Sequence, residues 1–324
     1  MALPTDKVIG IMADNLRKRK NVIPLSAKKS TAWAEGLNLP RGGETVIYTG
    51  LLYQLMPGIT GLAAKMASYE NSFMRHLMGM GRLANKFINV AAFMGGAKPA
   101  VYKEYNRILR NIACLLQKSG VEFGYLYEQE LYTGTLLHDN GVEHLVKKQA
   151  QRVWDVLQKN GVKEVITTDP HTTNMLRSVF PEMIEGYDLK VRSYLEVLAE
   201  VAPEATNPLN KELVIHDSCM YARYENVIDE PRQVLAKAGA KVVEPDYAGK
   251  LTWCCGGPVE SLFPAKSKGV AEERVSQLAE NGKQITAMCP ICVFSLREAA
   301  EKRDDGTEIH DIIDHLSEAY CIDK

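Results

Sequence analysis

The stretch "ITAMCPICVFSL" (residues 285–296) leads from an apolar run through the turn Cys-Pro-Ile-Cys into a second apolar segment. Its first part, with residue 284, predicts a short buried strand, and residues 294–303 have the composition of a helix. A strand that leads directly into a helix is the unit from which parallel α/β sheets are built. Cys289 and Cys292 therefore follow the C-terminal end of a predicted parallel strand.

The segments around this stretch alternate in the same way. Predicted strands are "ELVIHD" (212–217), "KVVEP" (241–245) and "KLTW" (250–253), and predicted helices are "EPRQVLAKAG" (230–239) and "SKGVAEERVSQLAENG" (267–282). We expect Ser267 to cap the second helix and Gly282 to end it. Strands that alternate with helices predict a parallel sheet covered on both faces.

The first half of the chain repeats this plan. The matching pairs are "ETVIYTGLLYQL" (44–55) with "ELVIHDSCMYAR" (212–223), "SGVEF" (119–123) with "AGAKV" (238–242), "LYTGTLL" (131–137) with "WCCGGPV" (253–259), and "VITTDPHTTNML" (165–176) with "ITAMCPICVFSL". Leu51, Tyr132, Thr133, Asp169 and Thr172 occupy the positions of the five clustered cysteines. The first half therefore repeats the scaffold without the thiols.

We predict an α/β fold with two pseudo-repeated lobes, each a small parallel sheet flanked by helices. Residues 1–205 form the lobe without the cysteines, and residues 206–324 form the lobe with them. The proline-containing stretch 200–212 is the predicted linker. Residues 57–102 have no counterpart and predict a helical insertion, since apolar residues recur at helical spacing. The insertion could pack on the lobe, dock a partner subunit or lie at a membrane surface.

Five of the seven cysteines come at or just after the C-terminal ends of predicted strands: Cys219, Cys254, Cys255, Cys289 and Cys292. Open α/β sheets form their ligand sites at this edge, so we expect the five thiols to converge on one crevice. Adjacent cysteines such as Cys254 and Cys255 rarely bond to each other, because the ring would be strained. In a chain without a secretory signal, clustered cysteines more often bind metal or carry out redox chemistry.

Composition excludes other classes of protein. The 324 residues are 46% hydrophobic and 24% charged with a formal net charge of -1, which is typical of a globular protein and gives no reason to expect a nucleic-acid partner. The first twenty residues hold no apolar stretch of the kind found in a secretory signal. No run approaches the roughly 20 apolar residues of a membrane span, so we expect no transmembrane segment.

The cysteine pattern C-x(34)-CC-x(33)-C-x(2)-C resembles a known family. This is the cysteine-rich CCG domain of the B subunit of heterodisulfide reductase and of the HdrD- and DsrK-like iron–sulfur oxidoreductases. "HDSCMYARYENVIDEPRQVL", "CCGGP" and "CPIC" carry the resemblance, with Ser218 where the family usually has proline. "NVIPLSAKKSTAWAEGLNLP" (21–40) is similar to the stretch that follows the ferredoxin module of the HdrD-like members. No C-x-x-C-x-x-C run occurs in these 324 residues.

The resemblance implies a [4Fe-4S] cluster on the five cysteines, which in the B subunit of heterodisulfide reductase is a non-cubane one. Five thiols suit this centre because an ordinary cubane takes four, and the fifth can bridge irons. Gly256 and Gly257 are expected to let the backbone approach the cluster and to offer N–H groups to its sulfurs. The alternatives from the residues alone are a zinc site and thiol chemistry without metal.

Other residues are open to two interpretations. His216 is either a packed core histidine or a neighbour of the cluster that acts on it by a hydrogen bond or as proton donor. Asp169 and His171 favour a surface turn capped by Asp-Pro over a metal site. Arg223 and Arg232 could neutralise cluster charge or be solvated. Cys114 is expected in the core, and Cys321 is expected to have no role.

We therefore predict an iron–sulfur electron-transfer subunit of a multisubunit heterodisulfide-reductase-like oxidoreductase, which is not active alone. Its expected partners are flavin or ferredoxin-like iron–sulfur subunits, since these residues contain no nucleotide fingerprint. The alternative is a catalytic subunit that reduces a disulfide or a thiol-coupled acceptor at the cluster, and a zinc-stabilised interaction module is third. The expected location is cytoplasmic, or at a membrane surface through a partner.

Overall fold

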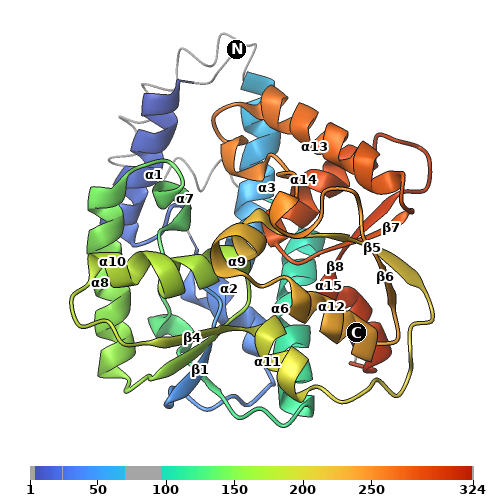
Figure 1. The fold of residues 1–324 in the computed structure, drawn as a ribbon. Coiled ribbons are helices and arrows are strands. Elements are labelled where there is room, and N and C mark those ends of the chain that lie inside the picture. The colour runs from blue at the N-terminus through green and yellow to red at the C-terminus, as the bar shows by residue number, and fades with distance from the viewer. Residues whose placement is uncertain (1–3, 24, 70–95, 323–324) are drawn as a thin grey trace.

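The computed structural model describes residues 4–23, 25–69 and 96–322, and it contains two four-stranded parallel sheets in separate halves of the molecule (Figure 1). In spatial order the first sheet consists of β2 Gly124–Tyr125, β1 Thr45–Tyr48, β3 Glu164–Thr167 and β4 Lys190–Ser193. The second consists of β6 Lys241–Val243, β5 Glu212–His216, β7 Gln284–Ala287 and β8 Glu308–Asp311. The predicted two-lobed α/β fold is confirmed.

Helices flank both sheets. In the first half they are α1 Thr5–Arg19, α2 Ala27–Thr31, α3 Leu52–Tyr69, α6 Pro99–Lys118, α7 Thr135–His138, α8 Glu143–Lys159, α9 Pro170–Asn174, α10 Phe180–Met183 and α11 Tyr194–Val201. In the second half they are α12 Asp229–Lys237, α13 Pro264–Ala279, α14 Pro290–Ala300 and α15 Ile312–Ala319. Two π-helices, η3 Met175–Val179 and η4 Met220–Glu225, and four 3-10 turns, η1 Ala32–Ala34, η2 Tyr127–Gln129, η5 Gly249–Leu251 and η6 Gly257–Val259, complete the described elements.

The two sheets have the same internal register. In the first, Val46 of β1 pairs with Gly124 and with Val165, which pairs with Val191. In the second, the corresponding residue of β5 is Val214, and the equivalent rows are Val214 with Val243, Val214 with Ile285, and Ile285 with Ile309. These pairings align the halves as the sequence repeat does. The carboxyl ends of equivalent strands therefore carry equivalent positions.

α3 and α6 join the two halves. Figure 1 shows both helices between the sheets, and α3 packs on α13 and α14 while α6 packs on α11 and α15. One cluster of buried apolar residues extends through both halves, from Trp33 to Tyr320. The hydroxyl of Tyr53 on α3 donates to Oδ2 of Asp311 in the second sheet, at 2.8 Å. The division into residues 1–205 and 206–324 stays a prediction, although the segment from 202 to 211 holds no helix or strand, as expected of the linker.

Several local predictions are wrong. "KLTW" is not a strand: its first residues form η5, because Asp217 accepts the Gly249 amide at 2.6 Å and its carbonyl accepts the Thr252 hydroxyl at 3.0 Å. α13 begins at Pro264, so Ser267 lies inside the helix and donates to the Gly256 carbonyl at 2.9 Å. The edge strands β4 and β8 were not predicted.

The predicted insertion at 57–102 is described only at its ends. α3 continues without a break from Leu52 through Pro57 to Tyr69, and α6 begins at Pro99. The apolar pattern between residues 71 and 94 lies outside the described residues. No helix in the described ranges combines the length and apolar composition needed to cross a bilayer.

Candidate metal centre

Three loops of the second lobe bring the five clustered cysteines to one edge of the sheet. Cys219 directly precedes η4, which follows β5, and Cys254 and Cys255 lie between η5 and η6. Cys289 is the residue before α14, and Cys292 lies in its first turn. The predicted convergence at the carboxyl ends of the strands is what the structure shows.

The five thiols form an unbroken series of contacts. Cys219 hydrogen-bonds with Cys254, Cys254 with Cys255, Cys255 with Cys292, and Cys292 with Cys289. Cys255, Cys289 and Cys292 are buried, whereas Cys219 and Cys254 are partly exposed. The site is therefore closed on the side of β7 and α14 and open at Cys219 and Cys254.

The surroundings of the thiols favour negative charge at two of them. Hydrogen bonds from Cys219 and Cys255, supported by the Gly256 amide at 3.3 Å, hold the pKa of Cys254 far below its usual value. Burial opposes ionisation of Cys289, but hydrogen bonds with Cys292 and His171 hold its pKa well below that of an ordinary thiol. Thiolates are the form in which cysteine binds metal.

Gly256 and Gly257 form a tight turn against α13 and α14. Gly256 has φ +79°, and a Cβ there would lie 2.6 Å from the Ser267 carbonyl oxygen. A Cβ on Gly257 would lie 2.2 Å from Cγ2 of Ile291. Packing against the two helices therefore requires these glycines, in addition to the amide that Gly256 directs to Cys254.

His216 at the end of β5 lies beside the thiols. A ring nitrogen of His216 and the sulfurs of Cys255 and Cys292 all lie within 4.8 Å of one another. Its Nδ1 accepts a hydrogen bond from Nε of Arg274 at 3.2 Å. Its Nε2 is buried and has no hydrogen-bond partner among the described residues. The ring thus lies beside two sulfurs of the site and has a buried nitrogen without a partner in the described residues. This arrangement fits a bound group that carries hydrogen-bond acceptors, as the sulfides and thiolates of an iron–sulfur cluster do.

The lobe without cysteines also reaches this site. His171 at the start of α9 is buried and hydrogen-bonds with Cys289. Its Nδ1 lies 3.6 Å from Oδ2 of Asp139 and 3.5 Å from the Thr135 hydroxyl. Burial opposes protonation of His171, but Cys289 and Asp139 raise its pKa to about 9.

The expectation of a surface turn at Asp169 and His171 is wrong, because both side chains are buried. The expected cap is present, since Asp169 accepts the Thr172 amide at 2.9 Å. The sequence did not indicate the contact between His171 and Cys289, because an Asp-Pro turn is normally expected at the surface. His171 is buried because the two lobes pack together. The only available signal was that His171 aligns with Ile291, between the two cysteines of the C-x-x-C motif.

Neither arginine proposed to neutralise cluster charge does so by direct contact with the thiols. Arg232 forms a two-pronged ion pair with Asp217 at 2.8 and 2.9 Å and bonds to Glu244 as well. Arg223 donates to the carbonyls of Lys250 and Thr252 and so holds the loop that leads to Cys254. Outside the site, Cys114 is half-buried on α6, and Cys321 is exposed.

The segment that contains the site is similar to a described family of domains. Residues 213–297 match the family model of the CCG cysteine-rich domain. All five cysteines fall in this range, which confirms the resemblance seen in the sequence.

The curated relatives are iron–sulfur or redox proteins. The EtfAB:quinone oxidoreductase of Syntrophomonas wolfei is 29% identical over 66% of this chain and 32% of its own length. The probable iron–sulfur-binding oxidoreductase FadF of Bacillus subtilis is 29% identical over 70% of this chain and 33% of its own. The B subunit of the fumarate reductase (CoM/CoB) of Methanothermobacter marburgensis is 26% identical over 54% and 37%. The chain thus spans about a third of the length of these relatives, and the similarity supports an iron–sulfur electron-transfer role.

Proposed function

We propose that this chain holds one iron–sulfur cluster and transfers electrons within a multisubunit oxidoreductase of the heterodisulfide-reductase kind. The ligands would be Cys219, Cys254, Cys255, Cys289 and Cys292. The observation that carries the proposal is the unbroken series of contacts between five thiols from three loops. A tetrahedral zinc site uses four ligands, so it would leave a thiol of this series unused.

The number of thiols favours a [4Fe-4S] centre of the non-cubane kind. A cubane takes four cysteines, and the adjacent Cys254 and Cys255 could serve different irons. When bound, such a centre takes up and releases single electrons. Gly256 and His171 would tune the centre through their hydrogen bonds to Cys254 and Cys289. Burial of Cys255, Cys289 and Cys292 would keep water from one side of it.

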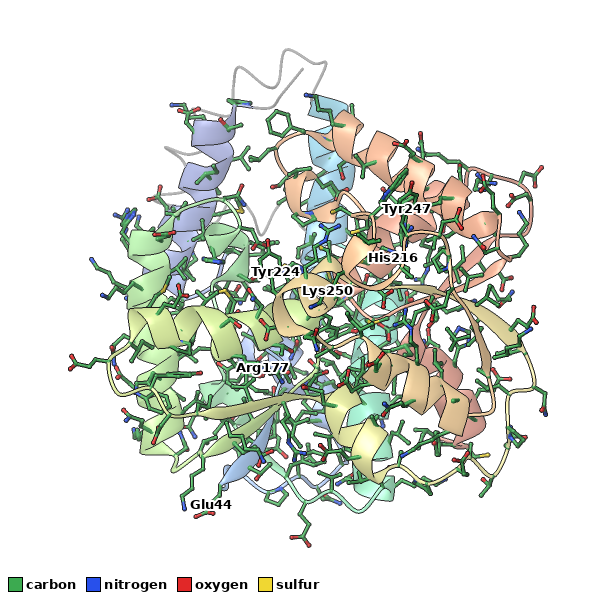
Figure 2. All side chains as sticks on the ribbon, viewed as in Figure 1. Glu44, Arg177, His216, Tyr224, Tyr247 and Lys250 are labelled. Carbon is green, nitrogen blue, oxygen red and sulfur yellow. The ribbon has the colours of Figure 1, made fainter. Side chains whose placement is uncertain are left out.

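The open side of the site is the side on which we expect a redox partner to bind. Seven large apolar side chains are exposed in the described residues, and six of them lie between 224 and 270, the part of the chain that contains Cys254 and Cys255. Tyr224 is 66% exposed and Leu251 70%, while Trp253 stacks on Tyr247 with ring centroids 4.7 Å apart. Figure 2 shows Tyr224, Tyr247 and Lys250 in the same region as His216. Exposed apolar patches of this kind mark contact surfaces.

Metal analysis of the anaerobically purified protein tests the proposal. We expect about four iron and four sulfide per chain, with an electron paramagnetic resonance (EPR) signal in one oxidation state. One zinc per chain would contradict the proposal and leave the interaction module as the better interpretation.

Single cysteine variants test the ligand set. Cys254→Ser and Cys255→Ser should each lose most of the iron, because serine oxygen replaces a thiolate within the series. Cys321→Ser, at an exposed cysteine outside the site, is the matched control and should keep full iron content. Retention of the cluster in both Cys254→Ser and Cys255→Ser would show that the ligands are wrongly assigned.

A second candidate, reduction of a disulfide at the cluster, is favoured by the partial exposure of Cys219 and Cys254. A substrate sulfur could approach the centre from this side. Addition of small thiols to the oxidised protein should then produce a new EPR signal. No change with a range of thiols would count against this activity and leave electron transfer unaffected.

A further inference from the structure

Arg274 is an arginine in the core of the second lobe. It lies in the middle of α13 and its exposed fraction is 0%, in a helix face that also buries Ala271, Val275 and Leu278. A buried arginine is rare unless it is paired with an acid, because removal of its charge from water is energetically costly.

All the hydrogen-bond partners of Arg274 are neutral. Its Nε donates to His216 Nδ1 at 3.2 Å, and its Nη2 donates to the Tyr247 carbonyl at 3.1 Å and to the Thr252 hydroxyl at 3.3 Å. Its Nη1 donates to the side-chain oxygen of Gln277. No carboxylate lies within ion-pair distance of Arg274 in the described ranges. Asp217, whose charge reaches it, is already paired with Arg232.

Apart from Asp217, which is paired with Arg232, the groups that can place negative charge near Arg274 are two cysteines of the site. Burial lowers the pKa of Arg274 to about 10, while Asp217, Cys292 and Cys255 act on its guanidinium in the opposite direction. Metal binding would convert Cys255 and Cys292 to thiolates and so supply negative charge near Arg274. Within the described residues, Arg274 is thus a fixed positive charge without an acidic partner of its own. The metal centre is the group that would balance this charge.

Arg274 also determines which nitrogen of His216 carries hydrogen. A guanidinium can only donate, so Nδ1 of His216 must accept and be unprotonated. In a neutral imidazole the hydrogen is then on Nε2, the buried nitrogen that has no partner among the described residues. The hydrogen bond from Arg274 to Nδ1 thus fixes the orientation of the His216 ring, and the Nε2–H remains available as a donor.

We propose that Arg274 is a positioning and charge-balancing residue of the iron–sulfur centre: its buried charge stabilises the reduced cluster, and its hydrogen bond fixes the Nε2–H of His216 toward the cluster sulfurs. This inference rests on the proposed function. Reduction adds negative charge to the centre, so a fixed positive charge nearby favours the reduced state and raises the potential.

The experiment compares Arg274→Met, which removes the charge, with Arg274→Lys, which keeps it, in anaerobically purified protein. Iron content is measured first, and the midpoint potential then follows from an EPR-monitored titration. We expect a lower potential in Arg274→Met and a potential near that of the unmodified protein in Arg274→Lys. The matched control is Arg303→Met, at a partly exposed arginine paired with Asp305, which should leave the potential unchanged.

A second pair keeps the test decisive if Arg274→Met does not retain iron. His216→Phe removes the donor, while His216→Gln places an amide N–H near the position of Nε2. Pulsed EPR in H₂O and D₂O should show one exchangeable proton fewer coupled to the cluster in His216→Phe than in the unmodified protein and in His216→Gln. The protons that Gly256 and His171 direct to the thiols remain in all three.

An unchanged potential in iron-replete Arg274→Met, or an unchanged set of coupled exchangeable protons in His216→Phe, would overturn this inference. Either result leaves the proposed function standing, because the cluster is present. Absence of iron and sulfide from the unmodified protein would instead refute the proposed function.

Discussion

The two lobes share their strand order and register but differ at the carboxyl edge of the sheet. In the second lobe this edge holds five thiols in contact. In the first lobe the equivalent residues, Leu51, Tyr132, Thr133, Asp169 and Thr172, are all buried. The same backbone therefore carries a site of five thiols in one half and a packed interior in the other.

In the first lobe, residues at the equivalent positions form hydrogen bonds with the surrounding protein. The Tyr132 hydroxyl accepts the Leu136 amide at 2.8 Å, and its carbonyl accepts from Gln149 at 2.7 Å. A Cβ on Gly50 would lie only 2.1 Å from the Thr172 hydroxyl oxygen. The comparison teaches that strand register positions a site, while side-chain volume and donor chemistry decide whether it can hold a ligand.

Alanine at one tight turn of each lobe, Gly256 in the second and Gly50 in the first, should separate the two lobes most strongly. Gly256→Ala forces a Cβ against the Ser267 carbonyl at φ +79°, so we expect most of the iron to be lost. Gly50→Ala meets a similar restriction at φ +54° in the first lobe. It should lower the free energy of unfolding by about 1–3 kcal/mol and keep the cluster. Iron analysis and urea denaturation measure both effects, and equal iron loss in the two variants would contradict the division of roles.

A buried carboxyl makes the first lobe's stability depend on pH. Burial raises the pKa of Glu130 to about 7, although Thr49, Tyr125 and Gly50 donate hydrogen bonds to it. The folded protein thus holds this proton more tightly than the unfolded chain, so the stabilisation is complete below pH 4.5 and is lost as pH rises to about 7. The shift corresponds to on the order of 3 kcal/mol.

Glu130→Gln should remove that part of the pH dependence. Burial also raises the pKa of Asp169 to about 6 and that of Asp311 to about 7. These two groups contribute the same pH dependence to the unmodified protein and to Glu130→Gln, so their contributions cancel when the two stability curves are subtracted. Urea denaturation between pH 4.5 and 7.5 gives the two curves. Parallel curves would show that Glu130 does not titrate in this range.

His171 is the point where the first lobe acts on the centre of the second. His171→Phe removes a hydrogen bond to Cys289, and the potential of the cluster should fall by on the order of 40 mV, the equivalent of about 1 kcal/mol for one electron. His144→Phe, at an exposed histidine of the same lobe, is the control. A potential that is unchanged in His171→Phe would mean that the first lobe only supports the fold.

The smallest effect is expected from returning thiols to the first lobe. Asp169→Cys with Thr172→Cys recreates a C-x-x-C turn, but Tyr132 and Thr133 still occupy the positions of the adjacent cysteines. Iron content per chain should not increase. A second equivalent of cluster would show that two thiols are enough to open the crevice.

Sequence patterns predicted the repeat, the parallel strands β1, β3, β5, β6 and β7, and the convergence of the five cysteines. The strands could be predicted because apolar runs and strand-to-helix turns depend on residues close in sequence. The convergence followed because parallel strands end at one edge of the sheet. Edge strands β4 and β8 alternate buried residues with exposed or half-buried ones, so no apolar run indicated them. "KLTW" has the composition of a strand, but bonds to Asp217 give it another conformation.

The chain's own order of residues determined which lobe could bind metal, because only one lobe has thiols at the strand ends. Tertiary structure alone decided the electrostatics of the site. Arg274 shares a helical face with apolar residues, and only the packing of α13 beside β5 brings its guanidinium into contact with His216. His171 meets Cys289, 118 positions away by residue number, only because α9 packs against the second lobe. Charges and donors act through distance in space, and that distance is set when both lobes fold on one core.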